Sequence, residues 1–220
     1  MITLRDVTLR QGGRVILSGL SGRFESGSMT ALIGANGSGK TTLLRALAGL
    51  HPVDSGVISR DGLRPADIAL LAQNSGLDRS FPITVRDVVA LAETKTGPFR
   101  RISRDRLAAA SAALARVGLA GMEDRVIQAL SAGQFQRVLF ARTILQDARF
   151  ILLDEPFTAI DSETTDVLTG ICQDWHNQGR TIIAVLHDMA MVRRFFPHTL
   201  LLVDGAGRWD ALPEPGLRAA

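Results

Sequence analysis

The chain has 220 residues, of which 46% are hydrophobic and 21% are charged, so it is long and apolar enough to bury a sizeable core. Lys and Arg exceed Asp and Glu by 25 − 22 = 3, a small excess that argues against nucleic acid as a partner. The apolar runs fall far short of the ~20 residues that cross a bilayer, and the N-terminus MITLRDVTLR carries charge where a secretory signal would be apolar. We therefore expect a globular protein that stays in the cytoplasm.

The cysteine and histidine content gives no sign of a protein-bound transition metal. Cys172 is the only cysteine, which excludes an internal disulfide, and its helical surroundings favour a small core residue. None of the four histidines has a cysteine or carboxylate at metal-ligand spacing. The densest basic stretch, residues 99–106, is more typical of a solvated face than of a nucleic-acid patch.

The first third of the chain predicts a β lobe followed by a strand, a loop and a helix. Residues 2–10 and 15–24 alternate apolar and polar side chains, which indicates antiparallel strands. SMTALIG, residues 28–34, predicts a buried strand, and KTTLLRALAGL, residues 40–50, predicts a helix that Gly49 and Pro52 end. The leucines expected on one face of this helix are Leu43, Leu44, Leu47 and Leu50.

The rest of the chain predicts an α/β fold with a mainly parallel sheet. Strand patterns at 150–154, 181–187 and 199–205 alternate with helical patterns, the first of them near 163–177. Residues 82–144 show almost only helical patterns, so we expect a helical lobe inserted into the core of a single domain, 1–220. The tail, about 205–220, contains prolines and is expected to be peripheral.

The stretch GANGSGKT fits the phosphate-loop pattern G-x-x-x-x-G-K-[ST] between a predicted strand and a predicted helix. Glycines let consecutive backbone N–H groups converge on a β-phosphate at the helix N-terminus, while Lys40 adds charge for the β- and γ-phosphates. The Thr41 hydroxyl can ligate Mg²⁺, and Thr42 can reach the α-phosphate. The predicted nucleotide-binding residues are Gly34, Ala35, Asn36, Gly37, Ser38, Gly39, Lys40, Thr41 and Thr42.

Two strand ends supply candidate catalytic groups. FILLDEP places Asp154 at the end of a wholly apolar strand, where its carboxylate suits Mg²⁺ through water. Glu155, one residue on, is expected to polarise the attacking water as general base. His187 follows the strand TIIAVL and is expected to contact the γ-phosphate.

A second helix start, LSAGQFQR at 130–137, stands between these motifs, and together they resemble the ABC-type ATP-binding domain over essentially the whole chain. The resemblance implies a signature motif formed by Ser131, Ala132, Gly133 and Gln134 that completes the ATP site of a second copy, hence a homodimer closed by ATP. It implies that Gln73 senses Mg²⁺ and contacts a transmembrane partner. It further implies that Asp161 lies at the dimer seam and that His187 is the switch histidine.

Two positions depart from the family pattern. Ala132 stands where a glycine is commoner. The family also has an aromatic residue near LRQGGRV that stacks on adenine, whereas Arg10 and Gln11 stand there and the chain contains no Tyr. Arg10, by stacking its guanidinium plane, or Phe24, from the next strand, are the conceivable substitutes.

A narrower resemblance rests on LDRSFPITVRDVVAL, residues 77–91, together with GQFQRVLFAR and FPHTLLL. These stretches resemble the ATP-binding subunits of bacterial zinc and manganese importers. This resemblance implies a transmembrane channel subunit, indirectly a periplasmic or lipoprotein solute-binding protein, and a place on the inner face of the cell membrane. GLAGMEDR, LSAGQ and DEPFTAID also resemble the haem-export subunit of cytochrome c maturation, which stays open as an alternative. An alternative of another class is a soluble ABC ATPase that acts mechanically.

Overall fold

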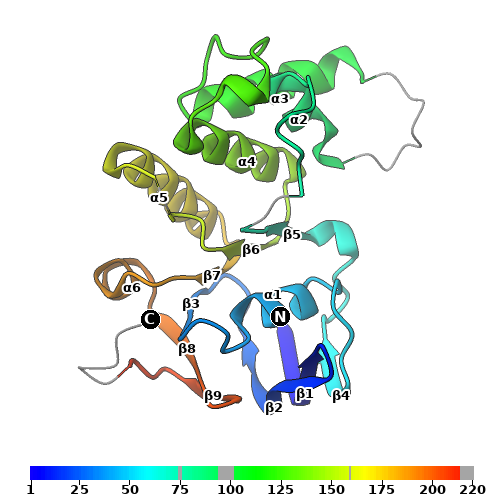
Figure 1. Cartoon of the computed structure of the whole chain (residues 1–220), viewed down its shortest axis with the longest axis vertical. Helices are drawn as coiled ribbons and strands as arrows, with labels where there is room; N and C mark the ends of the chain where they lie inside the picture. The colour runs from blue at the N-terminus through cyan, green and yellow to red at the C-terminus, as the bar shows by residue number, and fades with distance from the viewer. Residues whose placement is uncertain (74–75, 94–101, 159, 214–220) are drawn as a thin grey trace. The chain divides into compact units, whose positions relative to one another are not determined.

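The computed structural model describes residues 1–73, 76–93, 102–158 and 160–213, which fall into two compact units (Figure 1). The first unit comprises Met1–Gln73, Arg149–Pro156 and Asp174–Ala220. The second comprises Asn74–Ala148 and Phe157–Gln173. This unit includes the range predicted as a helical lobe, 82–144, and extends beyond it at both ends. The helix α5 (Ser162–Asn177) begins in the second unit and ends in the first.

A three-stranded antiparallel sheet opens the first unit, as the alternating patterns predicted. Its strands β1 (Ile2–Gln11), β2 (Arg14–Phe24) and β4 (Ser55–Ser59) lie in the order β2-β1-β4. The apolar residues of β1 are buried and several of its polar residues are exposed, because successive side chains point to opposite faces of a strand.

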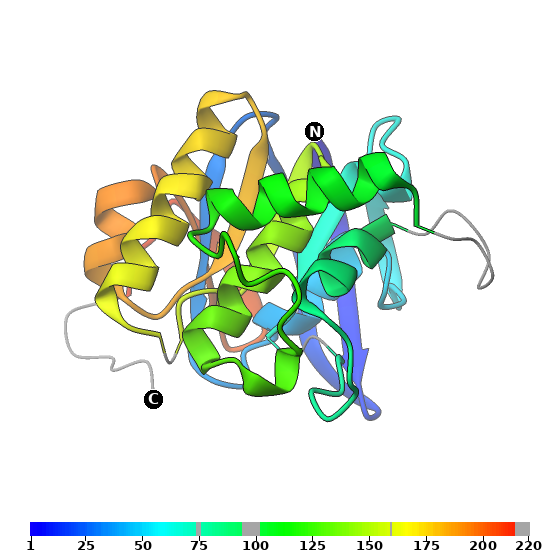
Figure 2. The same ribbon diagram turned by 90° about the horizontal axis from the view of Figure 1, so that it is seen from above.

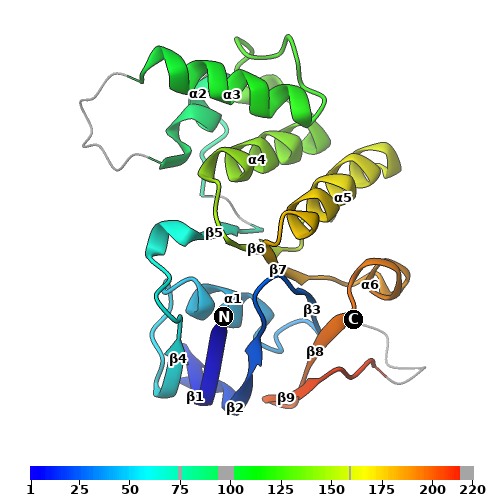
Figure 3. The same cartoon turned by 180° about the vertical axis from the view of Figure 1, so that it is seen from behind.

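The larger sheet of the first unit has the order β5-β6-β7-β3-β8-β9 and is parallel except at its last strand (Figure 3). Its strands are β5 (Ile68–Leu71), β6 (Phe150–Asp154), β7 (Thr181–Val185), β3 (Met29–Gly34), β8 (His198–Val203) and β9 (Ala206–Trp209). Every residue of β3, β6 and β7 is buried, as the central strands of a parallel sheet require. Because neighbouring strands run the same way, the carboxyl ends of β3, β6 and β7 meet at one edge of the sheet.

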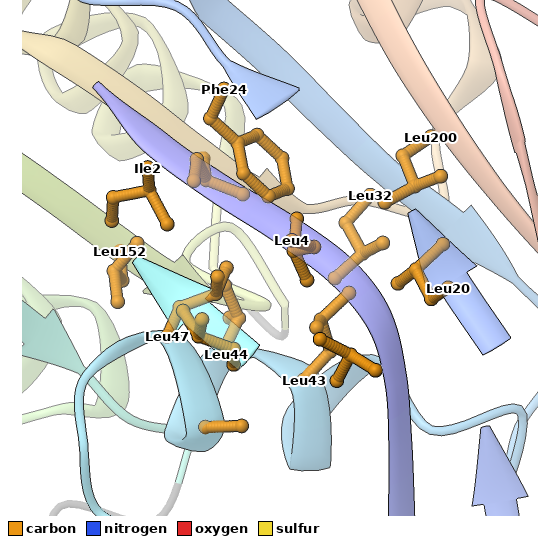
Figure 4. Packing of buried hydrophobic residues seen from close by; sticks show 14 of the residues in the cluster. Ile2, Leu4, Leu20, Phe24, Leu32, Leu43, Leu44, Leu47, Leu152 and Leu200 are labelled. Atoms are coloured by element: carbon orange, nitrogen blue, oxygen red, sulfur yellow. The ribbon is translucent and has the colours of Figure 1, made fainter. Parts of the chain in front are cut away.

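The helix α1 (Lys40–Leu47) carries leucines into the core of this unit (Figure 4). Leu43, Leu44 and Leu47 are fully buried in one cluster with Leu4 of β1 and Leu152 of β6. The cluster thus joins the two sheets through α1, and the burial of these side chains stabilises the loop that precedes the helix.

The prediction that Leu50 shares this buried face was wrong. The helix ends at Leu47, and the Leu50 side chain is 69% exposed. Gly49 adopts φ +76°, and the N–H of Leu50 donates to the carbonyl of Arg45, a helix-ending arrangement that turns the chain away from the helical path. The position after such a turn therefore no longer follows the helical period.

The second unit is built from helices that pack against one another (Figure 2). They are α2 (Val85–Ala90), α3 (Arg104–Arg116), α4 (Ala132–Gln146) and most of α5, with short 3₁₀ turns at Leu91–Glu93 and Ile127–Ala129. Cys172 of α5 is buried, which raises the pKa of its thiol and agrees with a core residue. Of the basic stretch at 99–106, residues 99–101 lie outside the described part.

The tail expected from about residue 205 begins at the edge of the larger sheet. Residues 206–209 form the edge strand β9, which pairs with β8. The indole of Trp209 lies 5.0 Å from the Phe24 ring between centroids, and its Nε1 donates to the carbonyl of Ser21 at 2.8 Å. The contacts of one aromatic ring can therefore hold a short strand in place where the local prolines and charges do not predict a strand. Residues 214–220 lie outside the described part.

The remaining helices of the first unit are the 3₁₀ turn η1 (Pro65–Asp67) and α6 (Met189–Phe195). No helix within the described ranges is long and apolar enough to cross a membrane.

Candidate functional site

The phosphate loop joins the carboxyl end of β3 to the first turn of α1. Gly34 has φ +153°, and a side chain there would meet the carbonyl oxygen of Leu202 at 2.5 Å and the Ser38 hydroxyl at 2.6 Å. Gly39 caps α1 with φ +99°. Both positions therefore require glycine. The first N–H groups of α1 have no partner within the helix and can bind an anion.

Lys40 places its ammonium group over this loop. It is 6% exposed, and its Nζ donates to the carbonyls of Gly34 and Ala35, each at 2.8 Å. Burial lowers the pKa of Lys40, and the nearby carboxylates of Glu155 and Asp154 oppose that shift. The positive charge is thus held where a triphosphate would lie against the loop.

Two observations fit a triphosphate with a divalent cation. The Ser38 hydroxyl oxygen is buried and has no hydrogen-bond partner within the described residues, as expected of a group that meets a phosphate oxygen. The Thr41 hydroxyl donates to Asp154 Oδ1 at 3.1 Å. Burial raises the pKa of Asp154, and the hydrogen bond from Thr41 opposes this. A hydroxyl and a carboxylate at this distance are oxygen ligands of the kind that Mg²⁺ prefers.

Glu155 lies at the centre of the candidate catalytic group. Its side chain is 16% exposed, its backbone has φ +51°, and its two carboxylate oxygens face different partners. Gln73 Nε2 donates to Oε2 at 2.8 Å, and His187 Nε2 lies 3.0 Å from Oε1. Because a carboxylate only accepts, the His187 ring must donate from Nε2. The structure therefore brings together three residues predicted from separate motifs, and it fixes the direction of the carboxylate.

The predicted signature motif forms the start of α4 in the second unit. The Ser131 hydroxyl accepts from the N–H of Gln134 at 3.2 Å, and Gln134 Oε1 accepts from the N–H of Ser131 at 3.0 Å. This is a capping box, yet the Ser131 O–H hydrogen remains available to a phosphate oxygen. Ala132 is exposed and helical, so its position does not require glycine.

Asp161 lies at the N-terminus of α5, also in the second unit. Its Oδ1 accepts from the N–H of Thr164 at 2.7 Å, and this bond lowers the pKa of Asp161. Ala159, within the motif TAID that carries Asp161, lies outside the described residues. The structure thus groups the predicted residues into two sets: the phosphate loop with Gln73, Asp154, Glu155 and His187, and the signature helix with Asp161.

Comparison with known proteins decides the family. The sequence profile of the ABC transporter family matches residues 17–158, more than half of the chain. The chain belongs to the ABC transporter family. The predicted family and fold class are therefore confirmed, and this ABC ATPase hydrolyses ATP to drive transport.

Similar proteins extend the match to most of this ABC ATPase. The zinc transport system ATP-binding protein of Treponema pallidum (strain Nichols) is 36% identical over 207 residues, which cover 91% of this chain and 77% of that protein. The hemin import ATP-binding protein of Chelativorans sp. (strain BNC1) is 35% identical, over 100% of this chain and 88% of that protein. An ATP-binding cassette solved as a dimer after hydrolysis, bound to ADP and Pi, is 25% identical with a TM-score of 0.84, and the match covers 97% of this chain and 99% of that one.

The stretch LRQGGRV, where the family resemblance implies an aromatic ring for adenine, carries Arg10 and Gln11 instead. Gln11, at the end of β1, accepts a hydrogen bond at 3.1 Å from the hydroxyl of Thr42 in the first turn of α1. Phe24 cannot substitute for the ring, because its side chain is 1% exposed and packs against Trp209 in the core. An amide that is hydrogen-bonded to α1 thus stands in the stretch where the family resemblance implies an aromatic ring.

We predict that this ABC ATPase discriminates poorly between ATP and GTP, with kcat/KM values within about tenfold of each other. Aromatic stacking is worth about 0.5–1.5 kcal/mol, and without it the triphosphate contacts that both nucleotides share dominate. Gln11→Tyr should raise the preference for ATP, while Val57→Tyr, which adds a ring at an exposed position of β4, should leave it unchanged. Parallel kinetics with both nucleotides test this. A wild type that prefers ATP more than tenfold, with no effect of Gln11→Tyr, would contradict it.

Proposed function

We propose that this ABC ATPase energises the import of a transition metal ion, such as zinc or manganese, from the inner face of the cell membrane. The supporting observation is the 36% identity with a zinc transport ATP-binding protein over 91% of this chain. Segment 77–91, the narrower resemblance to such importers, adds to it. The metal is the cargo and is not a ligand of this subunit.

In the proposed mechanism Glu155 acts as general base. Its carboxylate accepts a proton from the attacking water, and Gln73 and His187 hold it in one orientation through their hydrogen bonds. Lys40 and the N–H groups at the start of α1 stabilise charge on the transferred phosphoryl group. His187 then lies close to the γ-phosphate as well as to Glu155, which fits its predicted role.

The proposed active unit is a homodimer with Mg²⁺ in each ATP site. Thr41 and Asp154 would hold the ion, with Gln73 nearby, and the ion would neutralise charge on the β- and γ-phosphates. Ser131 of one copy would donate its hydroxyl to the γ-phosphate of ATP bound by the other copy, beside the N-terminus of α4. In this homodimer, Lys40 of one chain contributes to one ATP site and Ser131 of the same chain contributes to the other.

Hemin import is a second candidate, because a hemin import ATP-binding protein is 35% identical over the whole chain. The haem-export subunit of cytochrome c maturation remains an alternative on the motifs named above. None of the residues assigned here touches the cargo, so the cargo has to be measured with the complete transporter.

The deciding experiment reconstitutes the subunit in proteoliposomes with its channel subunit and solute-binding protein. ATP-driven accumulation of radioactive zinc or manganese, with none of hemin, is expected. Accumulation of hemin alone would show that hemin, and not a metal ion, is the cargo. Outward movement of haem would support the export alternative.

The docking surface for the channel is proposed to lie in residues 74–91, of which 74–75 lie outside the described part. Phe81 is 61% exposed, whereas Val85 and Val88 are buried and belong to the core of the second unit. Arg79 donates to the carbonyl of Leu130 and lies 4.8 Å from the centroid of the Phe135 ring in α4. Arg79, two residues before Phe81, is thus in contact with the start of the signature helix.

Phe81→Glu is expected to abolish transport and leave basal ATP hydrolysis near the wild-type rate, because a charge on an exposed side chain weakens docking without disturbing the core. Transport in proteoliposomes and hydrolysis by the free subunit are the two measurements. Leu50→Glu, a charge at another exposed hydrophobic side chain, serves as the matched control and should preserve both. Loss of both activities together with the fold in Phe81→Glu would instead assign Phe81 to the core.

A further inference from the structure

A single hydroxyl connects the signature helix α4 to the start of α5 within the second unit. Thr164 is 2% exposed, and its Oγ1 donates to Asp161 Oδ2 at 3.1 Å. The same oxygen accepts from Arg137 of α4 through Nε at 3.2 Å and Nη2 at 2.8 Å. Its one hydrogen and its acceptor capacity are therefore both used, which makes Thr164 the junction between a carboxylate and a guanidinium group.

Gly133 brings the first turn of α4 against the same junction. A side chain at Gly133 would lie 3.3 Å from Asp161 Oδ2 and 3.3 Å from Thr164 Oγ1. The Asp161 carboxylate is fixed from its other side, since Oδ1 accepts from the N–H of Thr164. Gly133 thus packs against the Asp161 carboxylate and the Thr164 hydroxyl, and Thr164 holds that carboxylate in place.

This arrangement restricts where Ser131 can point. Gly133 and Arg137 are one helical turn apart on the same face of α4, and both meet the Asp161–Thr164 pair. Two contacts along one face hold the helix against both translation and rotation. The Ser131 hydroxyl and the first N–H groups of α4 are therefore positioned by the contacts of Gly133 and Arg137 with the Asp161–Thr164 pair.

We propose that Thr164 is a positioning residue that orients the start of α4, and with it Ser131, toward the γ-phosphate bound by the second copy. The assignment rests on the proposed homodimer. It predicts that a change at Thr164 alters ATP hydrolysis at the phosphate loop of the other subunit. If Thr164 acted instead through Asp161 and the preceding Glu155, its effect would fall on the site in its own subunit.

The first experiment replaces the hydroxyl by a methyl group of nearly the same shape. Thr164→Val should lower kcat about tenfold with little change in the KM for ATP, because the interaction is made as the γ-phosphate reacts. Thr164→Ser, which keeps the hydroxyl, should restore most of the rate. Thr169→Val is the matched control, since Thr169 is also buried on α5 and donates only to the carbonyl of Thr165 within the helix. Melting curves of the three variants show whether each is folded.

The second experiment uses mixed dimers with one intact site. In a dimer of a Lys40→Ala chain and a Ser131→Arg chain, the intact site takes its phosphate loop from the second chain and its signature helix from the first. Thr164→Val in the Lys40→Ala chain is expected to lower activity about tenfold, and the same change in the Ser131→Arg chain is expected to have little effect.

The outcomes separate this assignment from the homodimer on which it rests. An inactive parent mixture, without any change at Thr164, would overturn the composite site and the assignment with it. An active parent mixture that loses equal activity whichever chain carries Thr164→Val, or loses it only in the Ser131→Arg chain, would overturn the assignment alone. Wild-type kcat in Thr164→Val would also overturn it.

Discussion

Replacing Glu155 by Gln is expected to slow ATP hydrolysis at least ~100-fold while ATP is still bound. The amide keeps the size of the side chain between Gln73 and His187 but has no carboxylate to accept a proton from water. The phosphate loop and Lys40, which bind the triphosphate, are unchanged. Single-turnover hydrolysis and equilibrium binding of labelled ATP are the measurements.

The control for this prediction is another Glu-to-Gln change in the same chain. Glu25 is half exposed and forms an ion pair with Arg23 at the surface, so Glu25→Gln should hydrolyse ATP at the wild-type rate. Turnover near the wild-type rate in purified Glu155→Gln would show that Glu155 is not the base.

Ser131→Arg and Lys40→Ala proteins are each expected to be almost inactive alone and to recover activity when mixed. In either homodimer every site lacks one component. An equimolar mixture contains about half mixed dimers, each with one intact site, so about a quarter of the wild-type activity should return if the sites act independently. Ser131 is exposed, so the arginine can be introduced without overpacking the core.

A chain that carries both substitutions provides the control for the mixing experiment. Mixed with Lys40→Ala protein it forms dimers without any intact phosphate loop, and no activity should return. Absence of recovery in the first mixture, with both proteins folded by melting and able to form dimers, would contradict a site shared between two copies. A specific activity that stays constant on dilution to nanomolar protein would contradict it as well.

Sequence patterns predicted the central strands and the phosphate loop because these features depend on neighbouring residues. A wholly apolar run such as FILL can be satisfied only by a strand or helix buried on all sides, and the acidic pair that follows it stands at the strand end. GANGSGKT specifies its own backbone through its glycines. Local patterns failed where a distant group decided the outcome. Residues 206–209 form an edge strand, and Trp209 contacts Phe24, which is 185 residues away by subtraction of their numbers.

The sequence alone therefore predicted the residues to which we assign the chemistry of this ABC ATPase: Lys40, Asp154, Glu155, His187 and the start of α4. Only the tertiary structure decided how these groups are oriented. Gln73 and Glu155 are 82 residues apart in the chain, and Arg137 and Thr164 are 27 apart, yet each pair is joined by a hydrogen bond. The physical reason is the distance along the chain between the residues that interact. Periodicity and glycine spacing report on contacts within one segment, whereas a hydrogen bond of about 3 Å between segments depends on how the whole sheet or helix pair is packed.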